Sequence, residues 1–253
     1  MAACAIAVMA KGPQPGRTKT RLVPPLTAGQ AAALSAAFLR DVTENIAAAG
    51  RQAAIQGFIA YAPAGTEALF DGHLAAGTRL VLADGGIAAP PRVQALGRSL
   101  LHAVRSLCAG GFGAVCLLNA DSPTLPTAFL LEAAAALARP GARVVLGPAE
   151  DGGYYLIGMT APHAHLFEDI AWSTHRVAAQ TRERASALGV DLVELPPWYD
   201  VDDAASLARL LASLDGSPSD PRAFAAPATK AWARRNAVSL HATDACGPLL
   251  PQQ

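Results

Sequence analysis

Short apolar runs alternate with longer amphipathic stretches along most of this chain. The apolar runs predict strands at residues 3–9, 54–61, 78–83, 114–120, 143–148, 154–159 and 191–195. The stretches between them predict helices at residues 27–49, 66–74, 93–108, 127–137, 173–188 and 203–214. The first helix has the clearest pattern, because apolar residues recur every four positions from Leu34 to Ile46 and Thr27 is placed to cap it.

Strands that alternate with helices predict an α/β fold with a mostly parallel sheet covered on both faces. Binding sites in such sheets lie beyond the carboxyl ends of the strands. The alternation stops near residue 214, and the sequence that follows is rich in proline, serine and alanine. We therefore expect one domain at residues 1–214 and a partly ordered extension at residues 215–253, with a short helical patch near residues 231–237.

Composition limits the classes of partner. Of the 253 residues, 52% are hydrophobic and 16% charged, which favours a large core over disorder. Twenty basic residues balance twenty acidic ones. A general nucleic-acid or anionic-membrane surface needs a cationic excess, so we expect neither partner, and any anion site must be local.

The expected compartment follows from the length of the apolar stretches and the spacing of the cysteines. The N-terminal apolar run is too short for a signal-peptide core and leads straight into cations, and no stretch approaches the roughly 20 apolar residues that span a bilayer. The scattered cysteines show no metal-ligand spacing and are expected to be reduced thiols: Cys4, Cys108, Cys116 and Cys246. We expect a cytoplasmic protein.

The segment after the first strand is a basic loop (residues 11–25) shaped by glycine and proline. Its candidate phosphate-binding residues are Lys11, Gly12, Arg17, Lys19 and Arg21. Polyphosphate binding needs convergent cations and a backbone that can approach closely, and this loop opens onto a helix. A solvated run of charge is the alternative. The spacing is not that of a Walker motif.

A carboxylate follows the apolar strand at residues 114–120. Asp121 stands at the carboxyl end of this strand, and Pro123 and Pro126 keep the next residues out of regular structure. A hard oxygen ligand at that edge suits Mg²⁺ or Mn²⁺. The alternative is an ordinary turn aspartate.

A second acidic segment precedes the strand at residues 154–159. In it Asp151 is followed by Gly152 and Gly153, which allow positive φ and close approach of the backbone to a ligand. Tyr154 follows at once. We interpret the segment as a substrate-facing loop, while a tight hairpin is the alternative.

Three aspartates lie between the last strand and the last helix of the domain. Asp203 is placed to cap that helix. Asp200 and Asp202 are two residues apart, and on extended chain such residues share a face, as metal coordination requires.

Together these segments resemble the glycosyltransferase-A-like family DUF2064. Its signature runs AKxPxPGxxKTRL, DSPTLP, GPxxDGGYYLIG, WST and WYDVD, which here are residues 10–22, 121–126, 147–158, 172–174 and 198–202. The resemblance spans residues 1–214 and implies a nucleotide-binding domain of the nucleotide-diphospho-sugar-transferase superfamily, a three-layer α/β/α fold with a mixed sheet. Residues 19–22 and 38–41 also resemble 2-phospholactate guanylyltransferases.

The resemblance implies roles for individual residues. The basic loop would bind a nucleotide's phosphates, helped by Gly97 and Arg98 of a middle motif (residues 94–98) that usually reads QxxGDLGxR in the family. Asp121, with Asp200 or Asp202, would hold Mg²⁺ (or Mn²⁺). The substrate-binding residues would be Asp151, Gly152, Gly153, Tyr154, Trp172 and Ser173, and the catalytic ones Lys19, Asp121 and Asp151. The middle motif lacks its usual Gly-Asp, and Ala120 replaces a common glycine, which puts nucleotide selectivity in question.

Two reactions fit these residues. In nucleotidyl transfer, a phosphate- or phosphonate-bearing acceptor attacks an NTP and pyrophosphate leaves; positioning and charge do most of this work. The alternative is glycosyl transfer from a nucleotide-sugar, with Asp151 as base. A non-catalytic nucleotide-binding protein is the third hypothesis. The expected partners are a nucleotide and a small-molecule acceptor, with a homodimer left open.

Overall fold

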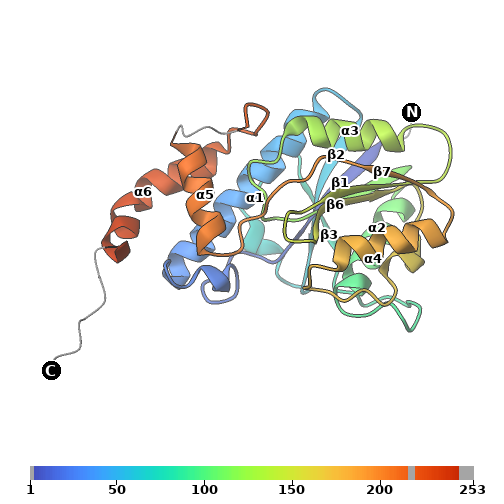
Figure 1. The fold of residues 1–253 in the computed structure, drawn as a ribbon, viewed down its shortest axis with the longest axis horizontal. Helices are drawn as coiled ribbons and strands as arrows, with labels where there is room; N and C mark the ends of the chain where they lie inside the picture. The colour runs from blue at the N-terminus through green and yellow to red at the C-terminus, as the bar shows by residue number, and fades with distance from the viewer. Residues whose placement is uncertain (1–2, 216–219, 245–253) are drawn as a thin grey trace.

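The computed structural model describes residues 3–215 and 220–244, and for residues 237–244 it describes the backbone alone. Within this part of the chain, seven strands form one sheet in the order β3-β2-β1-β4-β6-β5-β7 (Figure 1). The strands are β1 Cys4–Ala10, β2 Ile55–Tyr61, β3 Arg79–Leu82, β4 Ala114–Leu118, β5 Arg143–Pro148, β6 Tyr154–Met159 and β7 Asp191–Glu194. Strand β6 runs antiparallel to β4 and β5, while the other neighbouring strands are parallel.

Helices cover both faces of the sheet. They are α1 Ala28–Gly50, α2 Leu96–Ala109, α3 Thr127–Leu137, α4 Val177–Ala187, α5 Ala204–Leu214 and α6 Pro227–Asp244. One core lies between the sheet and α1 and α3, and a second lies between the sheet and α2 and α4. Alternate residues of the central strands feed the two cores, as with Ile6 and Ala7. The predicted three-layer α/β/α fold with a mixed sheet is confirmed.

Two helices begin later than the sequence predicts, because a residue with positive φ precedes each of them. Helix α2 begins after Ala95, whose φ of 47° is unfavourable for a residue with a side chain. Helix α4 begins at Val177 because Ser173, with φ 62°, holds its segment out of the helix. The predicted helix at residues 66–74 is only a 3₁₀ turn, Glu67–Phe70. Two further 3₁₀ turns lie at Thr20–Leu22 and Ala164–Phe167.

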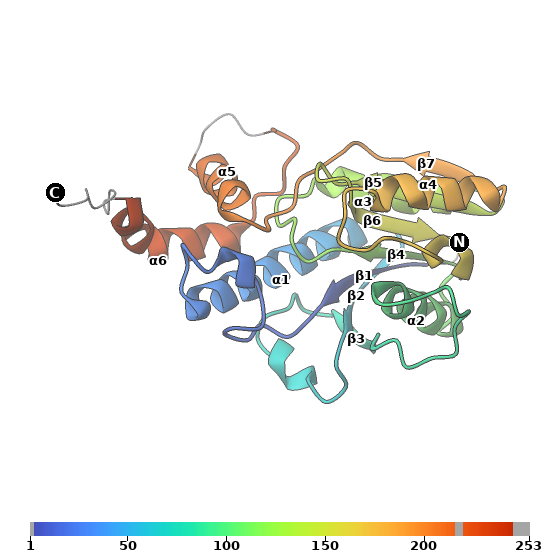
Figure 2. The same cartoon turned by 60° about the horizontal axis from the view of Figure 1, so that its bottom comes forward.

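The chain after α5 returns to the domain. Helix α6 has 18 residues, more than the short patch that the sequence predicts, and it packs beside α1 (Figures 1 and 2). Trp232 is buried against the core, and the carboxylate of Asp41 in α1 accepts hydrogen bonds from the backbone N–H groups of Ala228 (2.9 Å) and Thr229 (2.7 Å). The domain boundary near residue 214 stays a prediction, and residues 216–219 and 245–253 lie outside the described part.

No helix in the described residues has the length and apolar character needed to span a bilayer. Cys4 and Cys116 are buried as free thiols 4.0 Å apart, and Cys108 is a half-buried free thiol. Cys246 lies outside the described residues.

Candidate functional site

A pocket of about 680 Å³ opens at the carboxyl ends of β1 and β4. Met9 and Ala10 of β1 form part of its wall, and Ala120 lies on the segment after β4. The pocket therefore lies at the sheet edge where ligands of such folds bind. It collects predicted site residues from both halves of the sequence.

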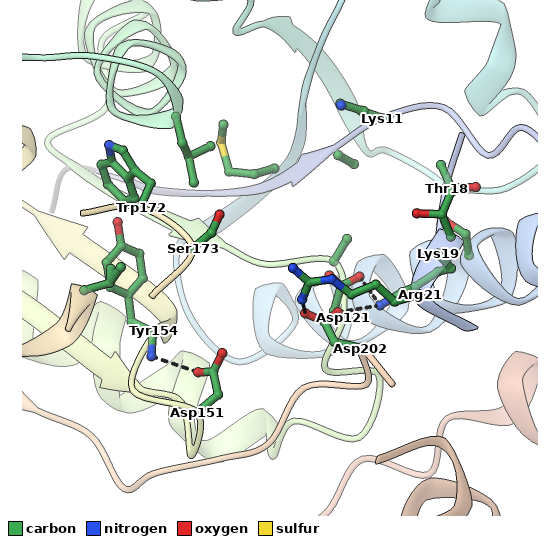
Figure 3. Close-up of a pocket in the computed structure, with 18 of the residues that line it drawn as sticks. Lys11, Thr18, Lys19, Arg21, Asp121, Asp151, Tyr154, Trp172, Ser173 and Asp202 are labelled. Atoms are coloured by element: carbon green, nitrogen blue, oxygen red, sulfur yellow. Dashed lines mark hydrogen bonds and ion pairs between the residues drawn. The ribbon is translucent and has the colours of Figure 1, made fainter. Parts of the chain in front are cut away.

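One end of the pocket is cationic and the other aromatic (Figure 3). The basic loop supplies Lys11, Arg17, Lys19 and Arg21. The acidic lining residues are Asp121, Asp151 and Asp202. Tyr154 and Trp172 lie together away from Lys19 and Arg21, and Ser173 lies between the two groups. Gly153 also lines the wall.

Lys19 joins the basic loop to two acidic segments. Its ammonium lies 2.7 Å from Oδ1 of Asp121 and 3.3 Å from Oδ1 of Asp202, and it donates to the Val201 carbonyl at 2.5 Å. Only 7% of the side chain is exposed. The backbone of Lys19 adopts a left-handed conformation, φ 51° and ψ 38°, before a 3₁₀ turn. The sequence therefore folds so that the loop places one cation between two carboxylates.

We call Asp121 and Asp202 the acidic pair. Backbone and side-chain hydrogen bonds fix the two segments that carry it. Val201 N–H donates to the Asp121 carbonyl at 2.9 Å, and the Ser122 hydroxyl donates to the Tyr199 carbonyl at 3.0 Å. The acidic pair is therefore held in register by groups other than its own carboxylates.

Asp200 does not line the pocket. Burial, together with the negative charges of Asp151, Asp202 and Asp121, raises the pKa of Asp200 to about 6. Of the two predicted metal ligands in this segment, Asp202 is the one that shares a cation with Asp121. Asp203 caps α5, as the sequence predicts.

The Asp-Gly-Gly segment is both a hairpin and a pocket wall. It connects the antiparallel strands β5 and β6, and Asp151 Oδ1 accepts a hydrogen bond from Gly153 N–H at 2.8 Å. Gly152 has φ 89°, and a Cβ there would lie 2.2 Å from the His175 carbonyl oxygen. Glycine at this position thus lets the hairpin pack on the segment that carries Trp172 and Ser173.

The aromatic end combines packing with exposure to the pocket. Trp172 is half-buried: it packs against the core under α2 and also lines the pocket. Behind it, a Cβ at Gly97 would lie 3.1 Å from the indole ring. The Tyr154 hydroxyl is buried without a hydrogen-bond partner among the described residues, and burial raises the pKa of Tyr154.

Five predicted site residues lie away from the pocket wall. They are Gly12, Gly97, Arg98, Gly152 and Asp200. The Arg98 guanidinium donates to the carbonyls of Gly85 (2.9 Å) and Ile87 (2.7 Å), and so holds a loop. Gly12 packs against Leu69, where a Cβ would lie only 2.5 Å from the Leu69 Cβ. The structure gives these residues supporting contacts and does not bring them to the wall.

Several wall residues were not predicted from the sequence. Ser35 of α1, Leu96 at the start of α2 and His175 line the pocket. His175 directly follows the Trp-Ser-Thr motif, and that position was the available signal. Ser35 gave none, since it is one small residue on an alanine-rich helix.

The donor set suits a hard divalent cation. Two carboxylates from separate segments already contact one positive charge, the Lys19 ammonium. In the part of the chain that the structure describes, no group of three or more His, Cys, Asp or Glu residues could hold a metal ion. Mg²⁺ is commonly bound by one or two carboxylates with substrate phosphates and water, so the acidic pair fits such an ion.

Solved structures share this fold. A protein of Desulfovibrio desulfuricans G20, provisionally named a nucleotide-diphospho-sugar transferase, is 27% identical, with a TM-score of 0.78 over 96% of this chain and 98% of its own. A cytidylyltransferase of Leptospira borgpetersenii serovar Hardjo-bovis (strain JB197) is 12% identical, with a TM-score of 0.53 over 99% and 100% of the two chains. CMP:2-keto-3-deoxy-manno-octonic acid synthetase with CTP is 11% identical, with a TM-score of 0.51 over 85% and 100%.

Sequence comparison gives the family. No curated protein matches the sequence significantly. The profile of the family described as "Uncharacterized protein conserved in bacteria (DUF2064)" matches residues 45–174, more than half of the 253-residue chain. The profile includes Asp121, the Asp-Gly-Gly hairpin and Trp172, and the resemblance found in the motifs is thereby confirmed. This chain belongs to the DUF2064 family.

Proposed function

We propose that this protein is a nucleotidyltransferase that joins an NTP to a phosphate- or phosphonate-bearing small molecule and releases pyrophosphate. The observation that carries the proposal is the convergence of Lys19, Asp121 and Asp202 in one pocket with further cations at the same end. This reaction asks for little covalent chemistry from the protein. Position and charge supply most of the rate enhancement.

The cationic end suits the triphosphate. Lys11, Arg17 and Arg21 line it, and the side chain of Arg21 is 73% exposed, 3.9 Å from Asp202. These cations would neutralise the β- and γ-phosphates and then the pyrophosphate that leaves. A triphosphate carries more negative charge than the diphosphate of a nucleotide-sugar, so this end favours the nucleotidyl reaction.

The acidic pair would hold Mg²⁺ (or Mn²⁺). When bound, the ion supplies charge neutralisation at the phosphates. The chain's own part is to keep two carboxylates in fixed register, which the contacts between the Asp121 and Tyr199–Val201 segments support.

The aromatic end is the proposed acceptor site. Trp172 and Tyr154 offer ring faces, and Ser173, Asp151 and His175 offer polar groups along the same wall. An acceptor seated there would present its phosphate or phosphonate oxygen toward the acidic pair. The attack forms a bond from that oxygen to the α-phosphorus as the bond to pyrophosphate breaks.

Glycosyl transfer is the second candidate, favoured by one specific observation. The Desulfovibrio protein, 27% identical over nearly the whole chain, carries the name of a nucleotide-diphospho-sugar transferase. In that reaction the acidic pair would serve a diphosphate. Asp151, exposed on the wall, would act as the acceptor's base.

The two reactions release different products. Each NTP is incubated with Mg²⁺ and a panel of phosphorylated and phosphonate acceptors, and pyrophosphate is measured; release that depends on the acceptor supports the proposal. Nucleotide-sugars are tested in parallel. Release of a nucleoside diphosphate from one of them, with no pyrophosphate from any NTP, would replace nucleotidyl transfer by glycosyl transfer.

A further inference from the structure

The ammonium of Lys19 has no capacity left for a phosphate in the observed arrangement. An ammonium has three N–H donors. Here three oxygens surround it, from Val201 (2.5 Å), Asp121 (2.7 Å) and Asp202 (3.3 Å), and the Phe38 ring lies below with its centroid 5.2 Å away. The side chain is 7% exposed. The observed arrangement therefore does not match the sequence-based role of Lys19 as a phosphate ligand.

The same ammonium stands where a cation shared by the acidic pair must stand. The carboxylates come from separate segments, and both contact Lys19 through Oδ1. Hydrogen bonds between those segments fix the pair. Lys19, by contrast, reaches the pair through a flexible four-carbon stem from a loop, so it is the member of the cluster that can move.

A divalent cation and an ammonium cannot share this position, because both are positive and both need the same oxygens. We infer that Lys19 and a divalent cation are alternative occupants of the position between Asp121 and Asp202, so that cation binding expels Lys19 toward the other cations of the cationic end. The inference rests on the proposed function for the identity of the cation. It also reconciles the two roles of Lys19: once displaced, its ammonium lies beside Arg17 and Arg21, which line that end.

Competition makes a directional prediction about metal affinity. The binding of Mn²⁺ alone, without nucleotide, is measured on the full chain by electron paramagnetic resonance of free Mn²⁺. Lys19→Met keeps the length of the side chain and removes its charge, so Mn²⁺ should bind more tightly, by about 5- to 150-fold, the usual range for coupled sites. An equal or weaker affinity than wild type would overturn the inference and make Lys19 an anchor that builds the pair.

Lys11→Met is the matched control. It removes one charge from the same loop and the same pocket, but Lys11 has no ion pair with a described residue and is exposed. Its Mn²⁺ affinity should change by less than about twofold, as expected for a screened charge that makes no direct contact. A gain equal to that of Lys19→Met would overturn the inference, since the effect would then be one of net charge.

A measurement on wild-type protein covers the case in which Lys19→Met does not fold. The chain has three lysines, Lys11, Lys19 and Lys230. With ¹⁵N-labelled lysine, the hydrogen-bonded ammonium of Lys19 should give a slowly exchanging NMR signal that diminishes as Mg²⁺ is added. An unchanged signal at saturating Mg²⁺ would overturn the inference.

These tests are separate from the test of the reaction. If Lys19→Met binds Mn²⁺ more tightly but the wild-type protein releases no pyrophosphate, the competition stands and nucleotidyl transfer is removed. If the wild-type protein releases pyrophosphate in the presence of an acceptor but Lys19→Met binds Mn²⁺ no more tightly, nucleotidyl transfer stands and the competition is removed.

Discussion

Two regions of this protein hold aspartates whose carboxylates receive their hydrogen bonds from different kinds of donor. Beneath α6, Asp41 is fully buried and accepts hydrogen bonds from two backbone N–H groups, those of Ala228 and Thr229. In the pocket, Asp121 and Asp202 remain 34% and 43% exposed and share the side-chain ammonium of Lys19. Backbone donors at a helix N-terminus are fixed, whereas a lysine side chain can leave.

The difference separates a structural carboxylate from an exchangeable one. Burial raises the pKa of Asp41, which shows that desolvation outweighs its hydrogen bonds. Such a group contributes to the position of α6 and has no path to a ligand. The acidic pair opens into a pocket of about 680 Å³ whose other cations remain near it. A carboxylate with a mobile partner and an open face is suited to exchange that partner for a ligand.

The largest expected effect is on activity, from Asp121→Asn. This change keeps the shape and halves the negative charge of the acidic pair, so kcat for pyrophosphate release should fall by about 10²–10³-fold, as when one electrostatic contact to a transition state is lost. Thermal unfolding should shift little, because the side chain is 34% exposed. Retained turnover would remove Asp121 from the reaction and leave it a turn residue.

The next effect is on stability, from Asp41→Ala. It leaves two backbone N–H groups of α6 without an acceptor, so the free energy of unfolding should fall by about 1–3 kcal/mol. Urea unfolding measures the change, and activity of the folded fraction should persist. The matched control is Glu44→Ala, one turn along α1, where the half-exposed carboxylate pairs with Arg40 and the change should stay within about 0.5 kcal/mol. Equal losses in free energy of unfolding for Asp41→Ala and Glu44→Ala would contradict the structural role of Asp41.

The sequence predicts much of the arrangement of the acidic pair in the pocket. Asp121 directly follows an apolar strand, and Asp202 lies in the segment after the last strand. Strand ends in such folds meet at one edge, so their convergence was predictable. That Lys19 would be the residue between them was not, because nothing in the pattern distinguishes it from Arg17 or Arg21 in the same loop. The left-handed backbone of Lys19 decides where its side chain points.

The order of the helical patch near residue 231 could not be predicted from the sequence. Its sequence is short of apolar periodicity, so it predicted little order. What stabilises α6 is remote: a buried Trp232 and the carboxylate of Asp41, nearly 190 positions earlier in the chain. Strand and helix periods report local burial, and a single long-range cap leaves no periodic signal. The same reason explains why Ser35, far from every motif, was missed as a pocket residue.

The smallest expected effect is the pH dependence of stability that Asp41 contributes. Because burial raises its pKa in the folded protein, the folded state holds the proton more tightly than the unfolded state. Its contribution is therefore complete below the ordinary carboxyl pKa of 3.8 and is lost as pH rises through the raised pKa. Stability relative to a variant without the titration should decline across that window and then level off.

Asp41→Asn supplies that reference, since it keeps the size of the side chain and one acceptor oxygen. The free energy of unfolding of wild type minus that of Asp41→Asn, measured by urea titration at a series of pH values, cancels the carboxylates common to both proteins. The difference should fall as pH rises above 3.8. A difference that grew with pH would mean that the two N–H donors of α6 outweigh burial, and Asp41 would then be an ion held by the helix terminus, closer in kind to the acidic pair than the structure indicates.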